Sequence, residues 1–131
     1  MKHRTIRTLA ASAAAVTAFG VIGVSPVSAK AGDIVRRGDC SARTDYKFKV
    51  QPRGATFEYE FEVDSNRNGQ AWRVRIADNG TVVFKGTRRT AAPSGSFSVS
   101  GRTSDRAGVD RFVARATNPA TGETCVARIS A

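Results

Sequence analysis

Apolar and polar side chains alternate along almost the whole chain beyond residue 44, with the period of two that is typical of half-buried β-strands. In residues 46–50 the aromatic and valine side chains share one face and two lysines share the other. After a turn signal at residues 51–54, residues 55–63 alternate in the same way, with three glutamates on the polar face. If these segments pair as a hairpin, lysines oppose glutamates, and each such pair contributes about 0.2–1 kcal/mol.

The same alternation predicts strands over residues 71–77, 81–85, 96–102, 109–117 and 123–130. Turn-forming residues separate these segments, and no helix is indicated after residue 29. Between the first two, Asp78-Asn79-Gly80 predicts a hairpin. A two-residue loop would mix apolar and polar faces, because a slip of one residue moves every side chain to the other face. We therefore predict a three-residue loop that sets Ile76 against Val82 and Val74 against Phe84.

About seven short strands within roughly 100 residues favour an antiparallel β-sandwich of the immunoglobulin or fibronectin kind. Trp72, on the third long segment, is in a position typical of a core tryptophan. The chain after residue 29 has the length of one domain, so we expect a single sandwich over residues 30–131. A closed barrel is the alternative architecture.

Residues 1–29 have the pattern of a secretory signal peptide. Basic residues come first, an apolar run from about Leu9 to Val24 follows, and Val27-Ser28-Ala29 supplies small residues for cleavage. Cleavage after Ala31 is an alternative. The apolar run is shorter than the roughly 20 residues of a membrane-spanning helix. We expect a secreted, extracellular protein whose mature form has no membrane span.

Two cysteines, Cys40 and Cys125, remain after such cleavage. Secreted proteins meet oxidising conditions, and two cysteines allow only one intramolecular pairing. The predicted disulfide ties the segment before the first long strand to the last strand. A zinc site is not favoured, because the cysteines are far apart and the only histidine, His3, leaves with the signal peptide.

Three stretches, residues 61–74, 88–96 and 116–125, resemble a group of small secreted actinobacterial proteins to which no activity is assigned. The resemblance extends over nearly the whole mature chain. It implies an extracellular location and a small size, and it transfers no functional residues.

The charge of the mature chain suggests an anionic partner. Signal-peptide removal leaves 18 basic and 11 acidic residues, and most of the basic ones are arginine. A positive field attracts polyanions without selecting one, and a merely solvated basic surface is the competing interpretation. The hairpin register chosen above collects three candidate anion-binding residues on one outer face, with two more in a loop at its edge; the candidates are Arg73, Arg75, Lys85, Arg88 and Arg89. The expected partner is a cell-wall polymer or an acidic glycan.

Motifs for catalysis and metal binding are weak. Asp64–Gly69 matches the first half of a calcium loop, but Arg75 stands where the bidentate acid is needed, so we predict an Asx-type turn and no metal. The acids at positions 58–64 lie about 7 Å apart along a strand, a spacing known from glycosidases, but lysines oppose them. Without histidine no Ser-His or Cys-His pair is available, although a Ser-Lys pair stays formally open.

We therefore expect a monomeric, non-enzymatic binding or cell-envelope-associated module without a cofactor. Two other binding functions compete with polyanion capture. One is recognition of another protein by pairing at a sheet edge. The other is protease inhibition through a reactive loop at residues 88–93, which begins with Arg88-Arg89.

Overall fold

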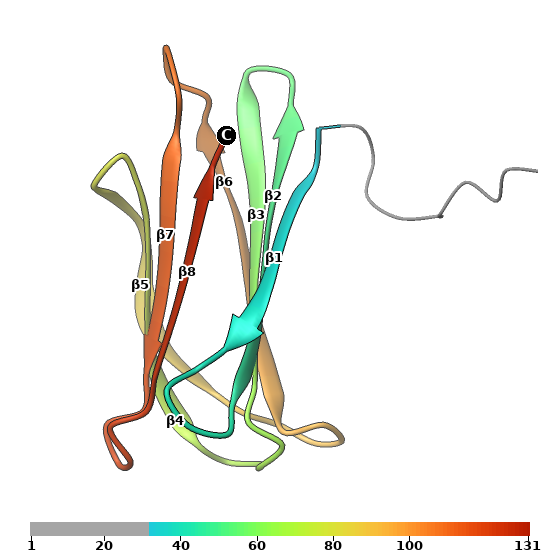
Figure 1. Cartoon of the computed structure of the whole chain (residues 1–131), viewed down its shortest axis with the longest axis vertical. Coiled ribbons are helices and arrows are strands. Elements are labelled where there is room, and N and C mark those ends of the chain that lie inside the picture. Colours follow the sequence, from blue (N-terminus) through green and yellow to red (C-terminus); the bar gives the residue numbers. More distant parts are fainter. Residues whose placement is uncertain (1–31) are drawn as a thin grey trace, which may run out of the picture.

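The computed structural model describes residues 32–131, so the predicted signal peptide lies outside the described residues. Eight antiparallel strands form two four-stranded sheets, which have the orders β1-β2-β3-β6 and β5-β4-β7-β8 (Figure 1). The strands are β1 (Ile34–Asp39), β2 (Asp45–Arg53), β3 (Thr56–Asp64), β4 (Ala71–Asp78), β5 (Thr81–Arg89), β6 (Ser96–Ser104), β7 (Arg111–Thr117) and β8 (Thr124–Ser130). The predicted sandwich is confirmed, with β1 as a strand that the sequence pattern did not indicate.

The described part of the chain holds no helix that could cross a membrane. The strands run between two ends of the sandwich (Figure 1). The connections β1–β2, β3–β4, β5–β6 and β7–β8 share the lower end in that view, and the turns β2–β3 and β4–β5 lie at the upper end.

The core lies between the two sheets and consists of the apolar side chains that alternation assigned to the inner faces. Trp72, Phe48, Phe61 and Phe112 are fully buried, and the rings of Phe57 and Phe112 meet edge to face across the sheets. The β2–β3 hairpin sets Lys47 opposite Glu62 and Lys49 opposite Glu60, as predicted.

The predicted three-residue loop between β4 and β5 is wrong. Asn79 and Gly80 form a two-residue turn with φ angles of 48° and 81°, the left-handed conformations that a type I′ turn requires. A β-bulge then inserts Val83 into β5, so that Ile76 faces Phe84 and Val74 faces Gly86. The extra residue keeps Ile76 and Phe84 on the same face, so the longer loop that was predicted for this purpose is not needed.

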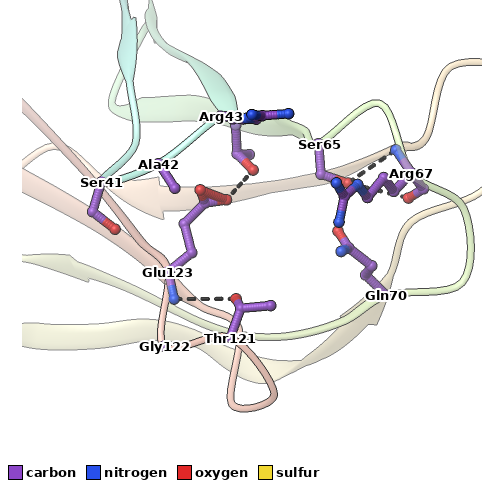
Figure 2. A pocket seen from close by; sticks show the side chains of 10 residues that line it. Ser41, Ala42, Arg43, Ser65, Arg67, Gln70, Thr121, Gly122 and Glu123 are labelled. Carbon is purple, nitrogen blue, oxygen red and sulfur yellow. Dashed lines mark hydrogen bonds between the residues drawn. The ribbon is translucent and has the colours of Figure 1, made fainter.

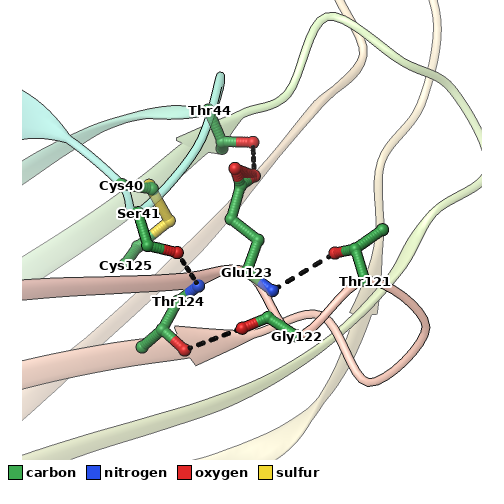
Figure 3. Close-up of a disulfide and its surroundings, with 8 residues drawn as sticks. All are labelled: Cys40, Ser41, Thr44, Thr121, Gly122, Glu123, Thr124 and Cys125. Carbon is green, nitrogen blue, oxygen red and sulfur yellow. Dashed lines mark hydrogen bonds between the residues drawn. A yellow bond between two sulfur atoms is a disulfide. The ribbon is translucent and has the colours of Figure 1, made fainter.

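The predicted Cys40–Cys125 disulfide is confirmed and joins one long edge of the two sheets (Figure 3). Cys40 directly follows β1, and Cys125 lies in β8. Beside the bond, the Ser41 N–H donates to the Thr124 carbonyl at 2.9 Å, and the Thr124 N–H donates to the Ser41 hydroxyl at 2.9 Å. The covalent bond and these hydrogen bonds together hold the β1–β2 connection against the start of β8.

The opposite long edge, where β5 lies beside β6, has a hydrogen bond instead. Tyr59 crosses the gap, and its hydroxyl donates to the carbonyl of the bulge residue Val83 at 3.4 Å. Burial raises the pKa of Tyr59 above 10.0. Gly101 lies directly across from Tyr59, and a Cβ there would stand 2.3 Å from the hydroxyl oxygen, so the tyrosine needs a glycine beside it.

Candidate anion-binding face

The outer face of the β5-β4-β7-β8 sheet carries cations and no acid. Successive side chains of a strand point to opposite faces, so the residues between the buried ones point outward. The single acid within these four strands, Asp78, is fully buried. The outward basic residues are Arg73, Arg75, Lys85, Arg89, Arg111, Arg115 and Arg128.

On the outer face of the β1-β2-β3-β6 sheet, basic and acidic side chains form ion pairs. Glu58 forms one ion pair with Arg102, at 2.6 Å, and another with Arg53, at 3.6 Å. Lys47 and Glu60 form a third pair at 3.7 Å. The two faces therefore differ in kind, since cations have acidic neighbours on one and none on the other.

Like charges also meet on this face, in a row of aspartates at one end of the first sheet. Asp45 lies opposite Asp39 and Asp64, and a hydrogen bond with Asp39 is the main cause that raises the pKa of Asp45. Arg37 and Lys47 oppose each other two residues further along, beside this row. This face therefore carries both acidic and basic side chains, unlike the outer face of the other sheet.

Four basic side chains surround a shallow hollow on the acid-free face. Arg75 lies opposite Lys85 on one side and Arg115 on the other, so three cations form a row across β5, β4 and β7. Arg73, two residues along β4, lies between Thr87 and Thr117. We call this hollow of about 370 Å³ the basic hollow. Within residues 32–131, none of its four cations has an ion-pair partner.

The structure brings together Arg73, Arg75 and Lys85, three of the predicted anion-binding residues. Their common face survives the wrong loop prediction, because the predicted and observed registers differ by two residues and keep the same parity. Arg115 is the residue that sequence reasoning missed. It reaches the hollow because β7 pairs with β4, a contact between distant segments that alternation alone does not indicate.

Arg88 and Arg89 are placed differently from the prediction, because they end β5 and do not belong to a loop. Arg88 points to the other face of the strand, with its guanidinium carbon 4.8 Å from the centre of the Phe84 ring. Arg89 points outward at the rim and donates to the Gly69 carbonyl at 3.2 Å. A reactive loop beginning at Arg88 does not fit this arrangement.

The segment that resembles half a calcium loop forms the predicted Asx-type turn. The Asp64 carboxylate accepts a hydrogen bond from the Asn66 N–H at 2.9 Å. Asn66, with φ of 56°, takes the left-handed conformation that asparagine tolerates. The side chain thus bonds its own backbone.

Two buried carboxyls lie at the upper end of the sandwich, away from the basic hollow. Asp110 accepts hydrogen bonds from Asn79 at 2.9 Å and from the Arg106 N–H at 3.1 Å. Asp78 is fully buried, and neither of its carboxyl oxygens has a hydrogen-bond partner among the described residues. Burial, and after it the charge of Asp110, raises the pKa of Asp78 above 3.8.

Asp78→Asn is expected to raise the free energy of unfolding at pH 7 by about 1–3 kcal/mol, because it removes a buried charge that lies beside the carboxyl of Asp110. The folded state binds a proton at Asp78 more tightly than the unfolded state, so the stability that this carboxyl contributes falls as the pH rises above 3.8. Urea unfolding of both proteins between acidic and neutral pH measures the gap, which should shrink towards low pH. Glu62→Gln, on the outer face of the other sheet, controls for the loss of one negative charge. A gap that is the same at every pH would contradict the assignment.

Comparisons with known proteins identify no family. No family model matches the chain, and no curated protein is similar to it in sequence. Among solved structures, the crystal structure of chicken MD-1 complexed with lipid IVa is similar at 13% sequence identity and a TM-score of 0.36. The match covers 79% of this chain and 93% of that chain. At this level of similarity no ligand is transferred.

Proposed function

We propose that the protein is a secreted, non-enzymatic binding module that captures an anionic polymer of the cell envelope or an acidic glycan with its basic hollow. The observation on which the proposal depends is the absence of acids from the outer face of the β5-β4-β7-β8 sheet. The confirmed disulfide is compatible with an extracellular location.

Repulsion within the basic hollow favours an anionic ligand. Like charges directly opposite each other destabilise a sheet, and cross-strand pairs are worth about 0.2–1 kcal/mol each. Arg75 meets a cation on both sides, and a bound anion would relieve both contacts. Guanidinium groups bind phosphate, sulfate or carboxylate oxygens through two parallel hydrogen bonds, and Thr87 and Thr117 offer further donors.

The outer face also narrows the class of polymer. No aromatic side chain points outward from these four strands, so unpaired bases would find nothing on which to stack. A polymer that carries sulfate, carboxylate or phosphate groups therefore fits this face better than a single-stranded nucleic acid does.

Binding to heparin and to polyglycerol phosphate, measured over a range of salt concentrations, tests the proposal. Affinity should fall steeply with salt, because each neutralised charge releases counterions. The double variant Arg75→Gln/Arg115→Gln is expected to weaken binding by roughly tenfold or more and to lower the salt slope by about two. The matched control is Lys47→Gln/Lys49→Gln, which removes two charges from the outer face of the β1-β2-β3-β6 sheet and should change binding much less.

Equal loss in both double variants would mean that net charge alone attracts the polymer. Binding that ignores salt would contradict the proposal and favour recognition of another protein by edge pairing. Edge pairing has less support here, because the exposed strand β5 contains a bulge, a glycine and three cations, features that protect sheet edges.

A further inference from the structure

A second hollow, distinct from the basic hollow, opens at the lower end of the sandwich. Three connections surround it, β1–β2, β3–β4 and β7–β8, and its volume is about 410 Å³ (Figure 2). We call it the end hollow. Apart from alanine and glycine, its lining side chains are all polar or charged, and they include Arg43, Thr44, Arg67, Gln70, Thr121 and Glu123.

One wall of the end hollow is held rigidly. Glu123 lies two residues before the disulfide cysteine Cys125, and the Thr44 hydroxyl donates to one oxygen of its carboxylate (Figure 3). The Glu123 N–H donates to the Thr121 hydroxyl at 3.2 Å. The carboxylate is therefore fixed in place before any ligand arrives, which lowers the entropic cost of binding.

The opposite wall is the β3–β4 connection, and it is fixed as well. The Thr90 hydroxyl donates to the Arg67 carbonyl and accepts from the Gln70 N–H at 2.9 Å. The side-chain oxygen Oε1 of Gln70 is buried and has no hydrogen-bond partner among the described residues. A buried acceptor left without a donor costs about 1–3 kcal/mol, so a ligand N–H that reaches this oxygen would remove part of that cost.

Opposite charges line the end hollow without neutralising each other. Figure 2 shows Glu123 on one side and Arg67 with Gln70 on the other. No ion pair within 4.0 Å joins Glu123 to Arg67 or Arg43 in the described part of the chain. A ligand that bridges the two walls therefore meets an anion, an unfilled acceptor and a cation.

We propose that the end hollow binds a short peptide with both termini free. The ammonium group of the peptide pairs with Glu123, its carboxylate pairs with Arg67, and its amide N–H donates to Gln70 Oε1. A purely anionic ligand could pair with Arg43 or Arg67 but would leave Glu123 without a cationic partner, and an apolar one would find no apolar side chain larger than that of Ala42. The end hollow and the basic hollow share no lining residue, so the two proposals can fail independently of each other.

A nuclear magnetic resonance titration of the ¹⁵N-labelled protein with L-alanyl-L-alanine tests the proposal. The dipeptide should shift the amide signals of Thr44, Gln70 and Glu123. N-acetylation removes the ammonium charge and C-amidation removes the carboxylate, and each is expected to weaken binding by roughly tenfold, the size of one charged contact.

Variants then connect each terminus with its partner. Glu123→Gln keeps the acceptor for Thr44, and it should weaken the free dipeptide but not its N-acetylated form. Arg67→Gln should weaken binding of the free dipeptide but not of its C-amidated form. Arg75→Gln, in the basic hollow, is the matched control and should leave the titration unchanged.

Three results would overturn the proposal. The first is an N-acetylated dipeptide that binds as tightly as the free one. The second is inorganic phosphate that produces the same shifts, which would make the end hollow a simple anion site. The third is the absence of shifts at Thr44, Gln70 and Glu123 while the signals of the protein remain those of the folded state.

Discussion

Replacing both Cys40 and Cys125 with alanine is expected to lower the free energy of unfolding by about 4 kcal/mol. The bond closes a loop with a sequence separation of 85 residues, and it therefore removes many conformations from the unfolded chain. A single domain of about 100 residues has a total stability of roughly 5–15 kcal/mol, so the loss is a large fraction of it. Urea unfolding of the oxidised protein, the reduced protein and the double variant measures the effect.

The reduced protein serves as the control, because it should unfold at the same urea concentration as the double variant. A loss below about 1 kcal/mol would mean that the backbone pairing of Ser41 with Thr124 already holds this edge closed. The geometry of the end hollow should change as well, since the disulfide fixes the wall that contains Glu123. We expect weaker dipeptide binding in the double variant under conditions in which it is still folded.

Gly95→Ala is also expected to lower the free energy of unfolding strongly, because two backbone segments approach each other closely at Gly95. A Cβ at Gly95 would lie 2.2 Å from the Arg67 nitrogen and 2.6 Å from the Asn66 carbonyl carbon. Gly69 has a similar left-handed φ, 77° against 71°, but open space around its Cβ position. Gly69→Ala is therefore the matched control, with the conformational cost of about 1–2 kcal/mol alone. Gly95→Ala should cost about 1–3 kcal/mol more, because backbone must move.

Thermal or urea unfolding of both glycine variants measures the difference. The clash would break an ordered contact, since the Gly95 carbonyl accepts hydrogen bonds from the Ser65 N–H at 3.0 Å and the Ser65 hydroxyl at 3.2 Å. If both variants lost the same free energy of unfolding, the β5–β6 connection would be able to shift and accommodate the added methyl group without cost. The contact supports the β3–β4 wall of the end hollow, so Gly95→Ala should also weaken dipeptide binding.

Alternation predicted most of the residues that face the core, but Val82, which was predicted to oppose Ile76, pairs with Ala77 beyond the bulge and is exposed. A strand exposes every second side chain to the same face, so the positions of Phe57, Phe61 and Val74 follow from period two in any register of even parity. The fold class and the disulfide followed from the number of strands and of cysteines. The β4–β5 loop was predicted wrongly because a bulge changes parity within a strand, and no sequence pattern announced the extra residue Val83.

The two hollows were harder to predict from the sequence, because pairing between distant strands creates them. Arg75 and Lys85 are neighbours along one hairpin, and their common face could be predicted. Arg115 joins them only through β7, which is far away in the sequence. The end hollow depends on three connections that meet after both sheets have formed, and Gln70 and Glu123 have no local signal that links them.

The unequal distribution of charge between the two outer faces gives the molecule an electric dipole roughly perpendicular to its sheets. Close to a negatively charged surface, such a molecule does not tumble freely. It turns until the face with Arg75 and Arg115 points to the surface, and the glutamate-bearing sheet then points to the medium. The lower end of the sandwich lies sideways in this orientation, where diffusing solutes can reach it while the protein stays adsorbed.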